Sequence, residues 1–232
     1  MPLRPPSFRP AAPPDIMSAI VKICGLKRPE SLEAALAGGA DMVGFVFFEK
    51  SPRHLDLAEA RRLSELVRGR AEKVALVVNA DDSRIAAIVE ALAPDWLQLH
   101  GAETPERVAQ IRASFGRPIL KAIGVSEQAD FLCAPDYEAV SDRLLFDAKP
   151  PKGAVLPGGN GLSFDWTLLR DHACMAAKKN WMLSGGLDPE NVGVAIRLTG
   201  APGVDVSSGV EDAPGEKSAA KILAFIAAAR AA

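Results

Sequence analysis

The chain has 232 residues, and its 27 basic and 29 acidic side chains give a formal net charge of -2. This length suits one domain or one α/β barrel, and the near balance of charge does not indicate a protein that binds nucleic acid or an anionic membrane surface. No apolar run reaches the roughly 20 residues that a membrane span requires. Any anionic ligand must therefore be held by a local site.

The N-terminal segment differs in composition from the rest of the chain. Its first sixteen residues contain six prolines and lack the apolar core of a signal peptide. Proline removes backbone donors and favours extended chain, so we expect a disordered extension over residues 1–18 and a single catalytic domain over residues 19–232. Met17 directly precedes the first strand-like run. The extension is therefore either a harmless tail or the product of a start assigned upstream of the true initiator.

Beyond this extension, short β-branched runs alternate with longer amphipathic segments. The predicted strands cover residues 19–24, 41–47, 73–78, 95–100, 118–123, 143–147, 180–184 and 203–207. The predicted helices lie near residues 29–38, 57–68, 82–93, 104–113, 126–134, 165–172, 189–198 and 215–230. Residues suited to helix starts are Asp56, Asp82, Thr104, Pro29, Pro105 and Pro189. Gly38 and Gly200 fall where helices should end.

The strict alternation predicts parallel strands joined by helical crossovers. Eight such units within about 210 residues are the number and near-minimum length of a (β/α)8 TIM barrel. An open doubly wound sheet would usually have fewer strands, and no GxGxxG motif follows the first strand. We therefore predict a single (β/α)8 barrel, whose active site should lie at the C-terminal ends of its strands.

Three glycine-bearing loops, those after strands 6, 7 and 8, predict a phosphate site. Glycine lets the backbone approach a ligand closely and point several N–H groups at it, and many barrels hold phosphate on the last of these loops. The alternative is that these glycines only form turns; three such loops on adjacent units favour phosphate. The candidate residues are Gly159, Gly161, Gly185, Gly186, Ser207, Ser208 and Gly209.

The first strand ends in a cysteine with a lysine two residues before it. Side-chain alternation places Lys22 and Cys24 on one face, and closure of the barrel makes the eighth strand, with Asp205, its neighbour. A lysine in an apolar strand is costly unless it is paired, so we predict a Lys22–Asp205 pair inside the barrel. A nearby ammonium should lower the thiol pKa and make Cys24 a base near neutral pH. Alternatively, Cys24 is a small buried hydrophobe, while Lys22 or Asp205 contacts the ligand or the loops directly.

Other candidates follow later strands. Asp147 ends an apolar strand and, if its pKa is raised by burial, is a candidate general acid; otherwise it caps a loop. His100 either orients a substrate or bonds a loop carbonyl, and no partner in the sequence decides between these roles. Arg53 could bind a carboxylate with two hydrogen bonds, although an isolated loop arginine is more often solvated.

The remaining cysteines, Cys133 and Cys174, are interpreted as structural. An odd number of widely spaced cysteines without a CxxC pair supports neither a disulfide framework nor a zinc site. This pattern fits a reducing compartment, so we expect a cytoplasmic protein.

Successive segments of the chain closely resemble the motifs of the phosphoribosylanthranilate isomerase family. They are VKICGLKRPE, GFVFFEKSPRHL, LQLHGAETPE, LLFDAKPPKG, GGNGLSFDW, WMLSGGLDPENV and GVDVSSGVE. The resemblance runs from about Ile20 to the C-terminus, and KICG and DVSSGVE are specific in combination. One departure is Asn160, which stands where the family often has Thr or Ser between two phosphate-loop glycines. Because an amide can still donate a hydrogen bond, we expect only a tuned affinity there.

The resemblance implies a (β/α)8 barrel without cofactor or metal. It implies an Amadori rearrangement of N-(5-phospho-β-D-ribosyl)anthranilate to 1-(2-carboxyphenylamino)-1-deoxy-D-ribulose 5-phosphate in tryptophan biosynthesis. Cys24 matches the general base and Asp147 the general acid, which need separated pKa values. Arg53 matches a residue on the anthranilate side, and the glycine and serine loops match the phosphate site. Lys22, His100 and Asp205 complete the expected substrate-binding set.

The expected partner is a small phosphosugar, with no nucleic acid or membrane, and the expected assembly is a monomer or homodimer. Three other functions compete with this one. An aminoaldose isomerase of histidine biosynthesis would resemble its relatives in ending strand 1 in aspartate, against Cys24. An indole-forming synthase would need several inward lysines, for which only Lys22 and Lys121 are candidates. A non-catalytic phosphosugar- or FMN-binding barrel would have been free to lose Cys24 or Asp147.

Overall fold

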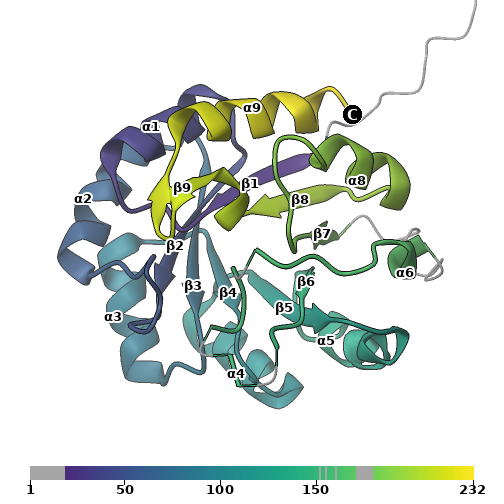
Figure 1. The fold of residues 1–232 in the computed structure, drawn as a ribbon. Helices are drawn as coiled ribbons and strands as arrows, with labels where there is room; N and C mark the ends of the chain where they lie inside the picture. The colour runs from purple at the N-terminus through teal and green to yellow at the C-terminus, as the bar shows by residue number, and fades with distance from the viewer. Residues whose placement is uncertain (1–18, 152, 155, 160, 171–179) are drawn as a thin grey trace, which may run out of the picture.

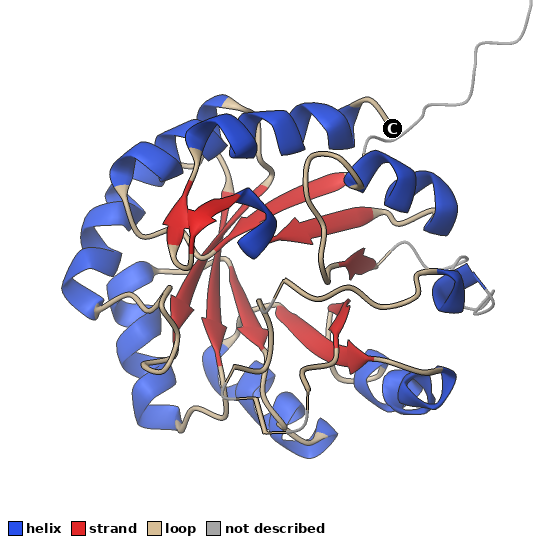
Figure 2. Cartoon of the chain, in the orientation of Figure 1, coloured by secondary structure: helices blue, strands red, loops and turns tan. Residues whose placement is uncertain are grey.

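The computed structural model describes residues 19–151, 153–154, 156–159, 161–170 and 180–232; the proline-rich extension, Asn160 and Cys174 lie outside these ranges. Eight parallel strands close into a barrel in the order β1 to β8. The helices lie on the outside of this barrel (Figures 1 and 2). The predicted (β/α)8 fold is therefore confirmed. The strands are β1 (Ile20–Cys24), β2 (Met42–Phe47), β3 (Glu72–Val77), β4 (Trp96–Leu99), β5 (Ile119–Val125), β6 (Arg143–Ala148), β7 (Trp181–Leu183) and β8 (Gly203–Val206).

Most helices begin and end where the sequence indicates. The first four are α1 (Pro29–Ala37), α2 (Leu57–Val67), α3 (Asp82–Leu92) and α4 (Pro105–Phe115). Asp56 and Thr104 cap α2 and α4 by accepting hydrogen bonds from backbone N–H groups of the first turn. The cap of α3 is Asp81, one residue before the predicted Asp82. Gly200 ends α8 (Val192–Thr199) in a left-handed conformation, as predicted.

The predicted helices at 126–134 and 189–198 differ in the structure. Residues 126–134 become a short 3-10 helix, η1 (Gln128–Cys133), followed by α5 (Ala134–Glu138). The Asp130 carboxylate accepts from the backbone N–H groups of Ser126 and Glu127, which stabilises this tight turn. α8 begins at Val192 and not near Pro189, because Asp188 accepts from the backbone of Glu190 and Asn191 and holds a turn there. α6 (Thr167–Arg170) is the described part of the predicted 165–172 helix.

The last predicted helix is shorter than expected, because its first part forms an antiparallel hairpin. A 3-10 turn, η2 (Ser208–Val210), leads into β9 (Glu211–Ala213) and β10 (Glu216–Lys217), and α9 (Ala219–Arg230) follows. Gly215, with a φ of 81°, supplies the left-handed residue that the turn of this hairpin needs. Within the described residues, no helix is both long enough and apolar enough to cross a membrane.

The barrel interior contains an apolar cluster and a buried ion pair. A cluster made of strand residues fills the lower part: Met42, Val74, Leu120, Ala122, Leu145 and Met182. Lys22 and Asp205 are register partners on β1 and β8, and their side chains form a buried ion pair with an Nζ–Oδ1 distance of 2.8 Å. The predicted pair is confirmed. Burial alone would lower the pKa of Lys22, but Asp205 and Cys24 raise it above its usual value.

This ion pair generates a stability prediction. Asp205→Leu leaves the Lys22 ammonium buried without a counter-charge, and we expect it to lower the free energy of unfolding by about 3–5 kcal/mol. Lys22→Met together with Asp205→Leu removes both charges and should recover most of that loss. Urea unfolding of the wild type, the two single variants and the double variant measures this. A double variant that is as unstable as the sum of its single changes would contradict the pairing.

Candidate active site

A cleft opens at the C-terminal end of the barrel. Lys22 is not among its lining residues, because it is buried beneath Asp205, and Gly209 also lies outside the lining. Asn160 is outside the described residues. The predicted site residues that line the cleft are Cys24, Arg53, His100, Asp147, Gly159, Gly161, Gly185, Gly186, Asp205, Ser207 and Ser208.

Cys24 ends β1 at the floor of the cleft and is 3% exposed. Burial raises the pKa of its thiol above the usual cysteine value, and the nearby Asp205 carboxylate raises it further. The Lys22 and Lys217 ammonium groups act in the opposite direction and do not overcome the burial. The predicted lowering of the thiol pKa is therefore wrong: the ammonium is present where expected, but desolvation of the thiolate outweighs it.

Asp147 is buried next to the last residue of β6 and has a partner that the sequence did not reveal. Its Oδ1 accepts from the backbone N–H of Ala148 at 2.9 Å, as a loop cap would. Its Oδ2 lies 3.3 Å from His100 Nε2. His100 Nδ1 is 3.1 Å from the amide nitrogen of Gln98. The His100 ring therefore lies between the Gln98 amide and the Asp147 carboxyl group, and these two contacts fix its orientation.

The loop after β6 covers this pair at Gly158. A Cβ atom at this position would lie 2.5 Å from Asp147 Oδ2 and 2.7 Å from His100 Nε2. No larger residue fits without moving one of the two side chains. The loop backbone therefore approaches the carboxyl–imidazole pair as closely as contact distances allow.

The loop after β7 brings two glycines to the cleft. Gly185 has a φ of 85°, and a Cβ atom there would lie 2.7 Å from the Ala148 backbone nitrogen, so both conformation and space require glycine. Within the described residues, no hydrogen bond occupies the backbone N–H groups of Gly185, Gly186 or Ser208. Such free N–H groups, gathered on loops after adjacent strands, can bind an anion. The Ser207 hydroxyl donates to the Cys24 carbonyl at 3.3 Å and ties these loops to β1.

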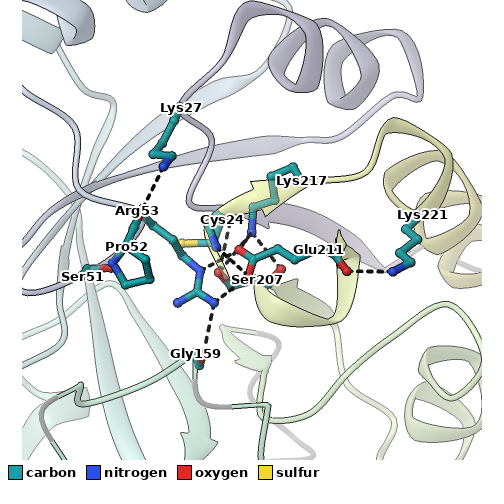
Figure 3. Close-up of polar contacts among 11 residues, drawn as sticks. Cys24, Lys27, Ser51, Pro52, Arg53, Gly159, Ser207, Glu211, Lys217 and Lys221 are labelled. Atoms are coloured by element: carbon teal, nitrogen blue, oxygen red, sulfur yellow. Dashed lines mark hydrogen bonds and ion pairs between the residues drawn. The ribbon is translucent and has the colours of Figure 1, made fainter. Parts of the chain in front are cut away.

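Arg53, in the loop after β2, is buried and paired (Figure 3). Its Nε and Nη2 donate to the two carboxylate oxygens of Glu211 at 2.7 and 2.9 Å, and Nη2 also donates to the Gly159 carbonyl at 3.2 Å. Lys217 Nζ contacts the same carboxylate at 2.8 Å. Sequence reasoning gave Glu211 and Lys217 no role. The signal was a Glu and a Lys six residues apart, directly after the serine-glycine loop of strand 8.

Apolar side chains form the wall of the cleft next to Cys24: Val46, Phe48, Leu76 and Val78. This wall could hold a flat ring.

Lys121, a candidate inward lysine, instead lies on the outer face of β5 with Ile119 and Ile123, and pairs with Glu103 at 2.8 Å. Within the part of the chain that the structure describes, no group of three or more His, Cys, Asp or Glu side chains is placed to hold a metal ion.

The sequence and fold both match proteins of one family. The family model described as N-(5'phosphoribosyl)anthranilate (PRA) isomerase matches residues 21–228. An N-(5'-phosphoribosyl)anthranilate isomerase of Nitrobacter hamburgensis is 59% identical over 216 residues, which cover 93% of this chain and 95% of that protein.

Two solved structures show the same likeness. Monomers generated from the dimeric phosphoribosylanthranilate isomerase of Thermotoga maritima have a TM-score of 0.78 and 35% identity, covering 92% of this chain and 100% of that one. A phosphoribosylanthranilate isomerase in complex with reduced 1-(o-carboxyphenylamino)-1-deoxyribulose 5-phosphate has a TM-score of 0.78 and 33% identity, with the same coverage.

The environment of Cys24 predicts its reactivity. Thiolates react with iodoacetamide and thiols do not, so a raised pKa should move the alkylation of Cys24 to a pH midpoint above the roughly 8.5 of a free cysteine. A protein with Cys133→Ser and Cys174→Ser keeps Cys24 as its single thiol. Its alkylation rate, followed by mass spectrometry from pH 6 to 11 beside N-acetylcysteine, measures the midpoint. A midpoint below that of the free thiol would show that the ammonium groups dominate.

Proposed function

Because this chain belongs to the N-(5'-phosphoribosyl)anthranilate isomerase family, we propose that it converts N-(5-phospho-β-D-ribosyl)anthranilate to 1-(2-carboxyphenylamino)-1-deoxy-D-ribulose 5-phosphate. The observation that carries this proposal is the position of Cys24 and Asp147 in one cleft. They end β1 and β6, with β7 and β8 between them, so they face a ligand from different sides. An aldose-to-ketose rearrangement needs an acid and a base arranged in this way.

The phosphate of the substrate occupies the loops after β6, β7 and β8. The free backbone N–H groups of Gly185, Gly186 and Ser208 supply donors without a side-chain cation. Gly161 and Ser207 border the same part of the cleft. A dianion bound there sets the direction of the sugar, with its first two carbons toward Cys24 and Asp147.

The anthranilate group occupies the opposite part of the cleft. Its ring packs on the apolar wall of Val46, Phe48, Leu76 and Val78, and its carboxylate meets the Arg53 guanidinium. Asp205 accepts a hydrogen bond from a sugar hydroxyl at the cleft floor. Lys22 acts on the ligand through Asp205, because its own side chain is fully buried.

The chemistry then needs two proton transfers. Asp147, in its acid form, protonates the furanose oxygen as the C1′–O bond breaks, and a cationic Schiff base forms. Its positive nitrogen acidifies the C2′ proton, which the Cys24 thiolate removes, giving an enolamine. The enolamine tautomerises to the ketone: its C2′ hydroxyl loses a proton to water and C1′ gains one from water. Proton exchange with water then returns Cys24 to the thiolate and Asp147 to the acid. A raised thiol pKa leaves less thiolate at neutral pH but makes each thiolate a stronger base.

Turnover of freshly made phosphoribosylanthranilate, followed by loss of its fluorescence, tests the function. We expect the wild type to be active and both Cys24→Ala and Asp147→Asn to lose at least about 100-fold in kcat, the lower range for a general acid or base. Cys133→Ala and Asp136→Asn, at exposed positions, are the matched controls and should keep full activity.

Each outcome of this assay has a distinct meaning. If only one of the two site variants is impaired, the other residue does not have its proposed role. If the folded wild type binds ribose 5-phosphate but turns nothing over, the chain is a binding protein and the proposed activity is wrong.

The close approach of the loop after β6 to Asp147 and His100 predicts the effect of adding a methyl group at Gly158. Gly158→Ala inserts a methyl group against Asp147 and His100, so we expect kcat to fall by about tenfold or more, since a small misplacement of a catalytic group can cost 100-fold. Thermal unfolding should change little, because the loop lies over the cleft and outside the core. Gly193→Ala is the control, because the nearest atom to a new Cβ there is the end of the flexible Arg197 side chain, at 3.3 Å. Full activity in Gly158→Ala would mean that the pair is not needed in this geometry.

A further inference from the structure

Three charged side chains form a buried cluster at the edge of the cleft, and the proposed chemistry uses only one of them. Arg53, Glu211 and Lys217 have side-chain exposures of 6%, 5% and 1%. They come from the loop after β2 and from the β9–β10 hairpin, as Figure 3 shows. Burying three charges is costly, and a structural role alone would be met as well by apolar packing. The cluster therefore suggests a function for the two residues that do not take part in the reaction.

The Arg53 guanidinium contacts its protein partners through Nε and Nη2. Nε and Nη2 are occupied by both carboxylate oxygens of Glu211, and Nη2 also by the Gly159 carbonyl. Nη1 has no hydrogen-bond partner among the described residues. Glu211 thus holds the guanidinium plane by one edge in a two-bond contact, which fixes its orientation more strictly than one bond could. The remaining edge is available to a ligand in the cleft, which Arg53 lines.

Lys217 gives Glu211 a second cation. Its Nζ lies 2.8 Å from Glu211 Oε1, 2.8 Å from the Ser207 carbonyl and 3.3 Å from the Ser207 hydroxyl. These three acceptors match the three donors of an ammonium group, so the geometry fits the charged form of Lys217. Burial lowers the pKa of Lys217, and the Glu211 carboxylate opposes that effect. Burial disfavours the Glu211 carboxylate, yet its bonds and charges with Arg53 and Lys217 hold its pKa below the usual value.

The charge of the cluster follows from these ionisation states. Glu211 is a monoanion between two monocations, so the cluster keeps one net positive charge. Arg53 and Glu211 without Lys217 would be neutral as a pair, and a neutral pair would attract a ligand carboxylate much less. Lys217 also bonds Ser207, whose hydroxyl donates to the Cys24 carbonyl. The same network therefore joins the carboxylate-binding edge to the end of β1.

We propose that Glu211 and Lys217 are positioning residues for Arg53. Glu211 orients the guanidinium so that its Nη1 edge meets the carboxylate of the aromatic amine, and Lys217 offsets the charge of Glu211 so that this edge remains cationic. The inference rests on the proposed function, because it takes the anthranilate carboxylate as the ligand group. It assigns specificity for a carboxylate-bearing amine to the β9–β10 hairpin as well as to Arg53.

The test compares ligands with and without the carboxylate. Free anthranilate and aniline are titrated into the protein by calorimetry, and the corresponding phosphoribosyl amines are compared as substrates. Lys217→Met removes the compensating charge; we expect it to weaken anthranilate binding and raise KM for the carboxylate substrate at least about tenfold. Its kcat should change less, and aniline and the aniline-derived substrate should be affected by less than about threefold. Lys217→Arg should restore part of the discrimination.

The Glu211→Gln variant distinguishes the orienting effect of Glu211 on Arg53 from the effect of its negative charge on ligand binding. Removing the carboxylate charge makes the cluster more positive, so charge alone predicts tighter anthranilate binding. Losing one of two guanidinium acceptors frees Arg53 to turn, so a positioning role predicts weaker binding, by about threefold or more. Tighter binding in this variant would overturn the positioning role of Glu211.

Lys221→Met is the matched control, because Lys221 contacts the Glu211 backbone carbonyl and Asp212 on the same hairpin but not the carboxylate of Glu211. It should leave the ratio between the two ligands unchanged. Equal losses for both ligands in Lys217→Met would mean a merely structural role and would overturn the inference. If the wild type binds anthranilate but turns over neither substrate, the proposed function fails while the binding measurements still test the positioning role.

Discussion

The buried ion pair between Lys22 and Asp205 joins the first and last strands of the barrel directly below the cleft. Parallel register brings these residues together although 183 positions separate them. A charge at this depth is stable only with its partner, so the pair constrains how β1 and β8 meet. Cys24 and Ser207 follow at the ends of the same two strands. The position of the candidate base, and of the serine loop that reaches its carbonyl, therefore depends on this one interaction.

Above that pair, Arg53 and Asp147 each have a protein partner on one side, and their other side faces the cleft. Glu211 occupies one edge of Arg53, and His100 occupies one oxygen of Asp147. Each partner restricts the orientation of the group that faces the cleft, which limits the loss of side-chain freedom when a ligand binds. In the proposed phosphate site, the loops after β7 and β8 present backbone N–H groups to the cleft in the same way, since glycine leaves them uncovered. The cleft is thus organised before the ligand arrives.

The barrel and the Lys22–Asp205 pair could be predicted because both depend on periodicity. Eight alternating units determine the fold, and alternation along two adjacent strands determines which side chains meet. The hairpin of Glu211 and Lys217 was missed although Pro214 and Gly215 are turn-forming residues, because strands of three and two residues are too short to show a period-2 alternation. The partner of Arg53, Glu211, lies 158 positions away in a short hairpin outside the barrel, to which the register of the barrel strands does not extend. The thiol pKa of Cys24 was predicted with the wrong sign because desolvation depends on burial depth, which a sequence does not give.

The most direct test of this account is an experimental structure of this protein with reduced 1-(o-carboxyphenylamino)-1-deoxyribulose 5-phosphate, the compound bound in a structurally similar isomerase. The account predicts the phosphate on the loops after β6, β7 and β8, and the carboxylate on Nη1 of Arg53. It also predicts that Cys24 Sγ lies about 3–3.5 Å from C2′, the separation of groups poised to react. A ligand bound in the reverse direction, with phosphate at Arg53 and the ring at Gly185, would contradict the account, as would a C2′ atom out of reach of Cys24.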